Sequence, residues 1–259
     1  VSPDWPTAAT ISPRQNMQRL LLNIGNTHIQ VATLTGHGPE LLVCYDTPDI
    51  RPLEMLPALE SMTTPWDAWA VSVVPPVRLS LEQRYGRRIR FLTPKDFPQL
   101  DFSPVDTSTL GMDRIANAAA ARSLTNSAVI VLDCGTAITT EALDSQGRFR
   151  GGAILPGRML QRKTLAAYTA QLPLIPLGQD APAALGCRTT EAIAAGIDRG
   201  IVGAVREIVA ATRRELESAD CPVLVTGGDA PFFTRHLPEL TPAPDLFTLR
   251  GIATAKPAV

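Results

Sequence analysis

The sequence lacks a strong excess of either charge, a long apolar run and any low-complexity tract. Its 24 Lys and Arg residues nearly balance its 25 Asp and Glu residues, so it has no general electrostatic attraction to nucleic acid or to an anionic membrane. No apolar stretch approaches the roughly 18 residues of a membrane-spanning helix. We therefore expect no nucleic-acid partner and no membrane association, and we expect the protein in the cytoplasm.

Paired metal ligands are also missing from the sequence. The four cysteines are too far apart to form a CxxC pair, so neither a zinc cluster nor a redox motif is indicated. We expect reduced, mostly buried thiols. The three histidines lack the spacing of metal ligands, and we interpret them as structural or exposed.

A sizeable hydrophobic core is within reach of this chain. At 259 residues and 45% hydrophobic content, it is long enough for one large domain or two of ordinary size. Residues 1–17 contain three prolines and no periodicity, and we expect a flexible N-terminal extension there.

A short phosphate-loop motif occurs twice. The first copy is Asn23-Ile24-Gly25-Asn26-Thr27 and the second is Asp133-Cys134-Gly135-Thr136, each at the end of an apolar run typical of a strand. A polar residue, a glycine and a hydroxyl residue can turn tightly and direct N–H groups at a phosphate, while the polar residue holds a metal. Two copies predict two related half-domains that face one nucleotide.

The apolar pattern around the two motifs is similar. Each motif is followed by further strands joined at short turns and then by helices and strands, which predicts an α/β fold made of two repeated halves. Residues 94–109 are polar and irregular, so we place the boundary there and predict half-domains over residues 18–110 and 111–259. The pattern also predicts helices over 51–62 and 189–218 and a last strand over 246–249.

Five segments in one order resemble the type III pantothenate kinase family: residues 24–27, 111–117, 133–137, 151–157 and 226–228. The resemblance runs from about residue 20 to the C-terminus. It implies the acetate and sugar kinase, Hsp70 and actin superfamily, with two ribonuclease H-like halves that have mixed five-stranded sheets flanked by helices. It also implies ATP-dependent phosphorylation of pantothenate, the first step of coenzyme A biosynthesis. Family members are homodimers that use ATP, Mg²⁺ and a monovalent cation, K⁺ or NH₄⁺.

Asp113 is the predicted catalytic residue, because phosphoryl transfer to an alcohol needs a carboxylate close to the attacking hydroxyl. The resemblance gives the same role to the aspartate of the Gly-x-Asp-Arg segment. It places Gly111, Met112, Arg114 and Thr189 at the acceptor, with Thr189 also expected as a helix N-cap. The alternative is that Asp113 only caps or charges the start of an alanine-rich helix.

Asp133 is the predicted metal ligand, because an unpaired carboxylate after a buried strand would be costly without a cation or backbone donors. The alternative is a turn-forming aspartate. The remaining predicted ATP-binding residues come from three glycine turns; they are Asn23, Gly25, Asn26, Thr27, Gly135, Thr136, Gly227 and Gly228. The Gly227-Gly228 pair is also compatible with an ordinary connection between a strand and a helix.

The sequence departs from the family pattern at two places. Family members typically have aspartate where this chain has Asn23, which lacks the negative charge that favours a hard divalent cation. Residues 104–107 replace a stretch that carries a tyrosine in many members. These departures leave two alternatives open: a catalytically weakened nucleotide-binding regulatory protein on the same fold, or a kinase of another small alcohol.

Overall fold

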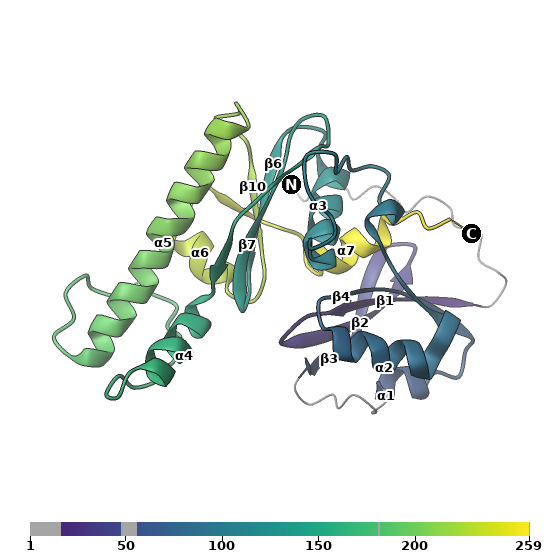
Figure 1. Ribbon diagram of the computed structural model, residues 1–259, viewed down its shortest axis with the longest axis horizontal. Coiled ribbons are helices and arrows are strands. Elements are labelled where there is room, and N and C mark those ends of the chain that lie inside the picture. The colour runs from purple at the N-terminus through teal and green to yellow at the C-terminus, as the bar shows by residue number, and fades with distance from the viewer. Residues whose placement is uncertain (1–16, 48–55, 181, 259) are drawn as a thin grey trace. The chain divides into compact units, whose positions relative to one another are not determined.

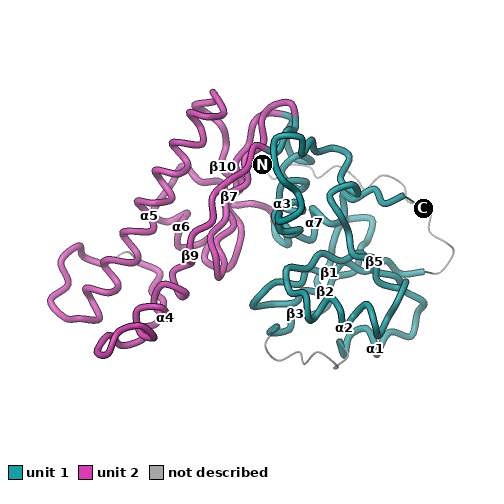
Figure 2. Tube along the Cα trace, viewed as in Figure 1, with its two compact units in different colours: residues 1–126, 147–149, 245–259 teal, residues 127–146, 150–244 magenta. Residues whose placement is uncertain are grey.

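The computed structural model describes residues 17–47, 56–180 and 182–258. The chain forms two compact units, shown in separate colours in Figure 2. Unit 1 contains residues 1–126, 147–149 and 245–259, and unit 2 contains residues 127–146 and 150–244. The predicted extension over residues 1–17 falls almost wholly outside the described residues. Within them, no helix is long and apolar enough to span a lipid bilayer.

Unit 1 is built on a five-stranded sheet with the order β3-β2-β1-β4-β5 (Figure 1). Its strands are β1 (Gln18–Ile24), β2 (His28–Thr35), β3 (Gly38–Asp46), β4 (Trp66–Ser72) and β5 (Ile89–Phe91). β1 is antiparallel to β2 and parallel to β4. Leu20, Leu21 and Leu22 are all completely buried, which explains why β1 reads as an uninterrupted apolar run rather than an alternating pattern.

Helices cover this sheet. They are α1 (Pro57–Glu60), α2 (Pro75–Tyr85), α3 (Met112–Leu124) and α7 (Phe247–Ala253), with short 3₁₀ turns η2 (Gly86–Arg88) and η3 (Pro94–Asp96). Within unit 1, α3 packs against α7 through buried alanines. The contact is so close that a Cβ added at Gly251 would lie 1.8 Å from the carbonyl oxygen of Ala116.

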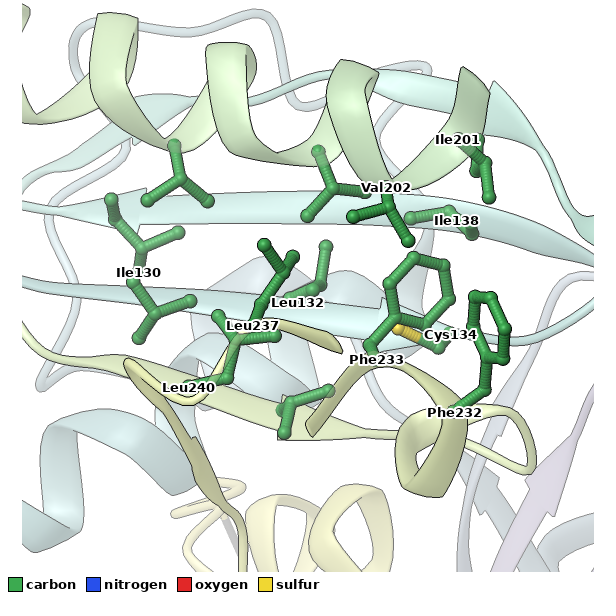
Figure 3. Close-up of a cluster of buried hydrophobic side chains, with 14 of the residues drawn as sticks. Ile130, Leu132, Cys134, Ile138, Ile201, Val202, Phe232, Phe233, Leu237 and Leu240 are labelled. Carbon is green, nitrogen blue, oxygen red and sulfur yellow. The ribbon is translucent and has the colours of Figure 1, made fainter. Parts of the chain in front are cut away.

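Unit 2 has a six-stranded sheet, in which β11-β10-β6-β7-β8 form the main order and β9 pairs with β7. The strands are β6 (Val129–Cys134), β7 (Ala137–Leu143), β8 (Phe149–Gly151), β9 (Ile154–Pro156), β10 (Val223–Thr226) and β11 (Leu240–Pro242). Its helices are α4 (Arg158–Tyr168), α5 (Thr189–Glu215) and α6 (Ala230–His236). Figure 3 shows side chains from β6, α5 and α6 filling one apolar core.

The two sheets repeat one topology. In unit 1, β1 pairs antiparallel with β2 and parallel with β4, and β4 pairs parallel with the edge strand β5. In unit 2, β6 pairs antiparallel with β7 and parallel with β10, and β10 pairs parallel with the edge strand β11. β1 and β6 therefore hold equivalent central positions. The predicted mixed α/β fold with two sheets and flanking helices is confirmed.

One predicted element is wrong. The segment predicted as a strand over residues 246–249 begins helix α7, and the edge strand of the second sheet is instead the short β11. The run Leu246-Phe247-Thr248-Leu249 is apolar enough to read as a strand, but Phe247 and Leu249 are buried in unit 1. Local sequence does not reveal that distant contact.

The unit boundary also differs from the predicted one. α3 and the segment from residue 245 belong to unit 1 by their contacts, because the small residues of α3 form the surface on which α7 packs. Of the helix predicted over residues 51–62, the structure describes only α1, since residues 51–55 lie outside the described part.

Gly251→Ala is expected to destabilise the protein. The new methyl group would overlap the backbone of Ala116, so α3 and α7 must separate, at a cost of about 1–3 kcal/mol. Thermal unfolding measures the effect. The control is Gly200→Ala in α5, where an added Cβ meets no described atom within 4 Å and helix propensity favours alanine. A melting temperature of Gly251→Ala at or above that of the unmodified protein would contradict the close packing.

Candidate active site

The turn after β6 in unit 2 is held by backbone contacts. The N–H of Gly135 donates to the carbonyl of Ala137 at 3.0 Å, and the N–H of Gly157 donates to the carbonyl of Thr136 at 2.9 Å. A Cβ added at Gly157 would lie 2.3 Å from the carbonyl oxygen of Gly135. The segment before α4 therefore reaches the turn only because residue 157 has no side chain.

A second glycine turn lies against the first. Gly227 has φ +92°, and a Cβ there would lie 2.5 Å from the carbonyl oxygen of Cys134 and 2.6 Å from Oδ1 of Asp133. The N–H of Asp229 donates to the same Cys134 carbonyl at 2.9 Å. The structure thus brings the predicted residues Asp133 and Gly227 together. Gly228, next in the turn, borders open space, since an added Cβ meets no described atom within 4 Å.

Asp133 and Cys134 point to opposite sides of β6, as successive strand residues do. The Cys134 side chain enters the apolar core beside Phe233 (Figure 3). Burial, with the negative charges of Asp133 and Asp229 adding to it, raises the pKa of the Cys134 thiol well above its ordinary value, so this cysteine stays protonated and unreactive. Asp133 is left on the side of the glycine turns.

The donor set fits Mg²⁺ bound together with a nucleotide. No group of three or more His, Cys, Asp or Glu side chains among the described residues is arranged to hold a metal. Mg²⁺ commonly binds through one or two carboxylates plus substrate phosphates and water. Asp133, with Thr136 and the glycine backbone beside it, supplies that kind of partial site.

The turn after β1 in unit 1 is closed by a similar backbone hydrogen bond but is one residue longer than the turn after β6. The N–H of Gly25 donates to the carbonyl of His28 at 2.9 Å, as Gly135 does to Ala137. Thr47, directly after β3, fixes the turn, since its hydroxyl donates to the Gly25 carbonyl at 2.7 Å and its N–H to the Thr27 carbonyl at 2.8 Å. The side chains of Asn26 and Thr27 are exposed and accessible to a ligand.

Asn23 occupies in β1 the place that Asp133 has in β6. Its Nδ2 donates to Oε1 of Gln30 at 3.1 Å, which orients the amide. Its Oδ1 is buried and accepts no hydrogen bond from the described chain. A buried acceptor without a donor is costly, and a metal-bound water is a donor of the kind that this oxygen needs.

Asp113 lies in the first turn of α3, beside the end of the sheet of unit 1. An added Cβ at Gly111 would lie 2.6 Å from Oδ1 of Asp113 and 3.6 Å from the side chain of Val73. Val73 directly follows β4, and its N–H donates to the Ile24 carbonyl at 3.0 Å. Asp113 therefore lies on the same side of unit 1 as the β1 turn, and the missing side chain at Gly111 leaves room for its carboxylate.

Desolvation dominates the electrostatics of Asp113. Burial raises the pKa of its carboxyl, although the N–H of Arg114 donates to Oδ1 at 2.8 Å and the Arg114 charge acts in the opposite direction. The N-cap of α3 is Gly111, and no side chain caps this helix end. Asp113 thus accepts from N–H groups of the first helical turn, its own and that of Arg114, and does not fill the N-cap position. A partly desolvated carboxylate with a raised pKa is a suitable general base.

Thr189 does not have the N-cap role expected for it. The N-cap of α5 is Arg188, and Thr189 is the first helical residue, with an exposed side chain. Glu191 fixes this helix start instead, because its Oε2 accepts the N–H groups of Cys187 at 2.9 Å and Arg188 at 3.2 Å.

Sequence reasoning missed a buried group of charges in unit 2. Arg158, Arg162 and Asp198 are each 1% exposed. The one available signal was two arginines four residues apart on an amphipathic helix that follows Pro156-Gly157. Such a pattern is more often a solvated helix face, so the sequence alone did not separate the two cases.

Comparison with solved structures identifies the fold as that of the actin-like ATPases. A Baf family transcriptional activator from Campylobacter jejuni superposes with a TM-score of 0.59 at 20% identity, covering 90% of this chain and 94% of its own. MreB5 of Spiroplasma citri bound to ADP superposes with a TM-score of 0.50 at 10% identity, covering 93% and 96%. At these identities the likeness establishes the fold alone.

The sequence identifies the family within that class. A family model of type III pantothenate kinase matches residues 19–211. The type III pantothenate kinase of Thermosynechococcus vestitus is 35% identical over 87% of this chain and 83% of that protein. The Chlorobaculum parvum enzyme is 34% identical over 90% of this chain and 92% of that protein. With the Rubrobacter xylanophilus enzyme, 36% identity extends over 57% of each protein. The chain belongs to the type III pantothenate kinase family.

Proposed function

We propose that this protein transfers the γ-phosphoryl group of ATP to the terminal hydroxyl of pantothenate, which gives 4'-phosphopantothenate in the first step of coenzyme A biosynthesis. Family membership supports the substrates. The observation that carries the chemistry is Asp113, a carboxylate with a raised pKa beside the end of a sheet. ATP as the phosphoryl donor supports the cytoplasm as the location.

Asp113 acts on the acceptor. The hydroxyl oxygen forms a bond to the γ-phosphorus, the bond between that phosphorus and the bridging oxygen breaks, ADP leaves and the hydroxyl proton passes to the Asp113 carboxylate. Gly111 preserves the space in which this carboxylate lies, and Arg114 binds negative charge on the acceptor or on the transferred group. Met112 and Thr189 contribute to the acceptor site.

Unit 2 binds the donor phosphates through the turns around Asp133. The backbone N–H groups near Gly135, Gly227 and Gly228 and the Thr136 hydroxyl donate to phosphate oxygens. Asp133 would hold Mg²⁺, which would neutralise charge on the phosphates. In unit 1, Gly25, Asn26 and Thr27 supply a second ATP-binding turn, and Oδ1 of Asn23 would serve a hydrated Mg²⁺ as a hydrogen-bond acceptor. A requirement for K⁺ or NH₄⁺ stays a prediction, which the kinase assay described below tests when it is run with and without each cation.

Asp113→Asn is expected to lower kcat by about 10²–10⁴-fold, the usual range for loss of a general base. The melting temperature at pH 7 should not fall, because the amide removes a charge that burial disfavours. In the unmodified enzyme, kcat should decline as pH falls through the raised pKa of Asp113, and therefore at a higher pH than for an ordinary aspartate.

The assay contains protein, ATP, Mg²⁺, K⁺ and pantothenate, and phosphopantothenate is detected by mass. An unaltered rate in Asp113→Asn would exclude the proposed base. ATP binding without product on any alcohol would favour the regulatory protein, for which Asn23 is the supporting observation. Turnover only on other alcohols would favour a different acceptor.

Asn23→Asp is expected to lower the Mg²⁺ concentration needed for half-maximal rate and to raise the rate itself. A carboxylate supplies the full charge that a hard cation favours, which an amide lacks. The control is Gln18→Glu, which adds the same charge at the other end of β1. Unchanged magnesium dependence in Asn23→Asp would contradict a metal role at this position.

The protein is further proposed to be a homodimer that associates through unit 2. Exposed apolar side chains lie there on β9, on α4 and in the segment before α5; they are Ile154, Leu160, Tyr168, Leu174, Leu177 and Leu185. Tyr168 and Leu185 are each 86% exposed. Exposed apolar groups of this kind mark interaction surfaces.

Tyr168→Ser combined with Leu185→Ser is expected to shift the protein from dimer toward monomer, as measured by light scattering across a concentration series. Leu79→Ser is the control, because Leu79 is also an exposed apolar residue, 56% exposed, but lies on α2 of unit 1. A monomeric unmodified protein, or a dimer that both sets of changes leave intact, would contradict this interface.

A further inference from the structure

Arg158, the first residue of α4, is at the centre of the buried charges of unit 2. Its Nε donates to Oδ1 of Asp198 at 2.9 Å and its Nη1 donates to Oδ1 of Asp229 at 2.8 Å. Its Nη2 donates to the carbonyl of Gly178 at 2.6 Å. One guanidinium group thus joins α5, the glycine turn after β10 and the segment that precedes α5.

Packing against an aromatic ring fixes the guanidinium group in addition to these hydrogen bonds. The carbon of the guanidinium lies 3.4 Å from the centre of the Phe232 ring, which places a cation on an aromatic face. The Arg158 side chain is completely buried, whereas the side chain of Asp229 is 16% exposed. Asp229 is therefore the only one of the two carboxylates on Arg158 that retains contact with solvent at the turn.

The other carboxylate has a second partner. Arg162, one helical turn further along α4, donates from Nη2 to both oxygens of Asp198 at 2.9 Å. Two arginines and two aspartates balance in charge. Asp198 keeps a cation without Arg158, but within the described residues the only side chain that bonds Asp229 is that of Arg158.

A buried ion network of this kind is a poor source of stability, because the cost of desolvating the charges offsets much of their attraction. It does provide geometry, since the planar guanidinium fork fixes the directions of its partners. The partner at issue is Asp229, whose backbone N–H closes the Gly227-Gly228 turn onto the Cys134 carbonyl. Arg158 also follows Gly157, which contacts the turn after β6.

We propose that Arg158 is a positioning residue for nucleotide binding: through Asp229 it holds the Gly227-Gly228 turn in the conformation that admits the ATP phosphates beside Asp133. The inference rests on the proposed function, in which this turn contacts ATP. Arg158 itself does not touch the nucleotide. Its loss allows the turn to relax and lowers affinity for ATP, while the chemistry at Asp113 is unaffected.

The test measures the dissociation constant of a non-hydrolysable ATP analogue with Mg²⁺ by calorimetric titration, alongside KM for ATP and kcat. Arg158→Met and Asp229→Asn are each expected to raise the dissociation constant roughly tenfold, in line with the cost of misplacing binding groups, with kcat nearly preserved. The double variant should bind no more weakly than either single variant, because both changes break one link.

Arg162→Met is the matched control, because it removes an arginine from the same network without touching Asp229. It should lower the melting temperature but leave the dissociation constant within about twofold. Arg158→Lys, which keeps a charge near Asp229, should restore part of the affinity. If Arg158→Met does not fold, Asp229→Asn alone tests the proposal. It changes the carboxylate of the ion pair that is partly exposed to solvent and leaves the buried guanidinium in place.

Two results would overturn the proposal. One is an unchanged dissociation constant in Arg158→Met or Asp229→Asn despite a lower melting temperature, which would make the network purely structural. The other is an additive loss in the double variant. Failure of the proposed function is separate, because it appears in the unmodified protein as absence of analogue binding or of phosphopantothenate.

Discussion

The close approach of backbone segments around the carboxyl end of β6 is the constraint on which unit 2 depends. Gly157 and Gly227 lie against the carbonyl groups of Gly135 and Cys134 at distances that leave no room for a Cβ. Two segments far apart in sequence, those of Gly157 and Gly227, therefore meet the turn that follows Asp133 through main-chain atoms. Because these contacts fix the backbone, the other N–H groups of the two turns keep set directions, which is the preorganisation that anion binding needs. The buried Arg158 group belongs to the same arrangement, because it fastens the last of these segments from behind.

Unit 1 has the same sheet topology as unit 2 but a neutral residue at the end of its central strand. Asn23 and Asp133 end equivalent central strands, and Gly25 and Gly135 make similar backbone bonds in the turns that follow. Only the second copy has a carboxylate at the strand end. Unit 1 has its carboxylate on α3 instead, at Asp113, where burial raises the pKa. The duplicated scaffold thus separates a charged end suited to cation and phosphate from a partly desolvated base suited to an alcohol.

The sequence predicted the sheets well, because their central strands are short, buried and ended by glycine turns. β1 and β6 read as apolar runs that stop at Asn23 and Asp133, so both turns were visible locally. Contacts across long sequence separations were not visible. Leu246-Phe247-Thr248-Leu249 was predicted as a strand because its helical partner is distant in sequence: Thr248 of α7 bonds Asn117 of α3, 131 residues earlier. No role was predicted for Arg158, because its acidic partners lie 40 and 71 residues away. The roles of individual site residues stay predictions.

The return of the chain to unit 1 affects the order of folding during synthesis. The helix that carries Asp113 is made before unit 2, but α7, the surface on which it packs, emerges from the ribosome only after residue 245. Until then, the alanine face of α3 has no such partner within its own unit. Unit 2 can form its own core while the chain is still being translated. The helix bearing the proposed base therefore acquires its final packing last, so the nascent chain completes unit 2 before it completes unit 1.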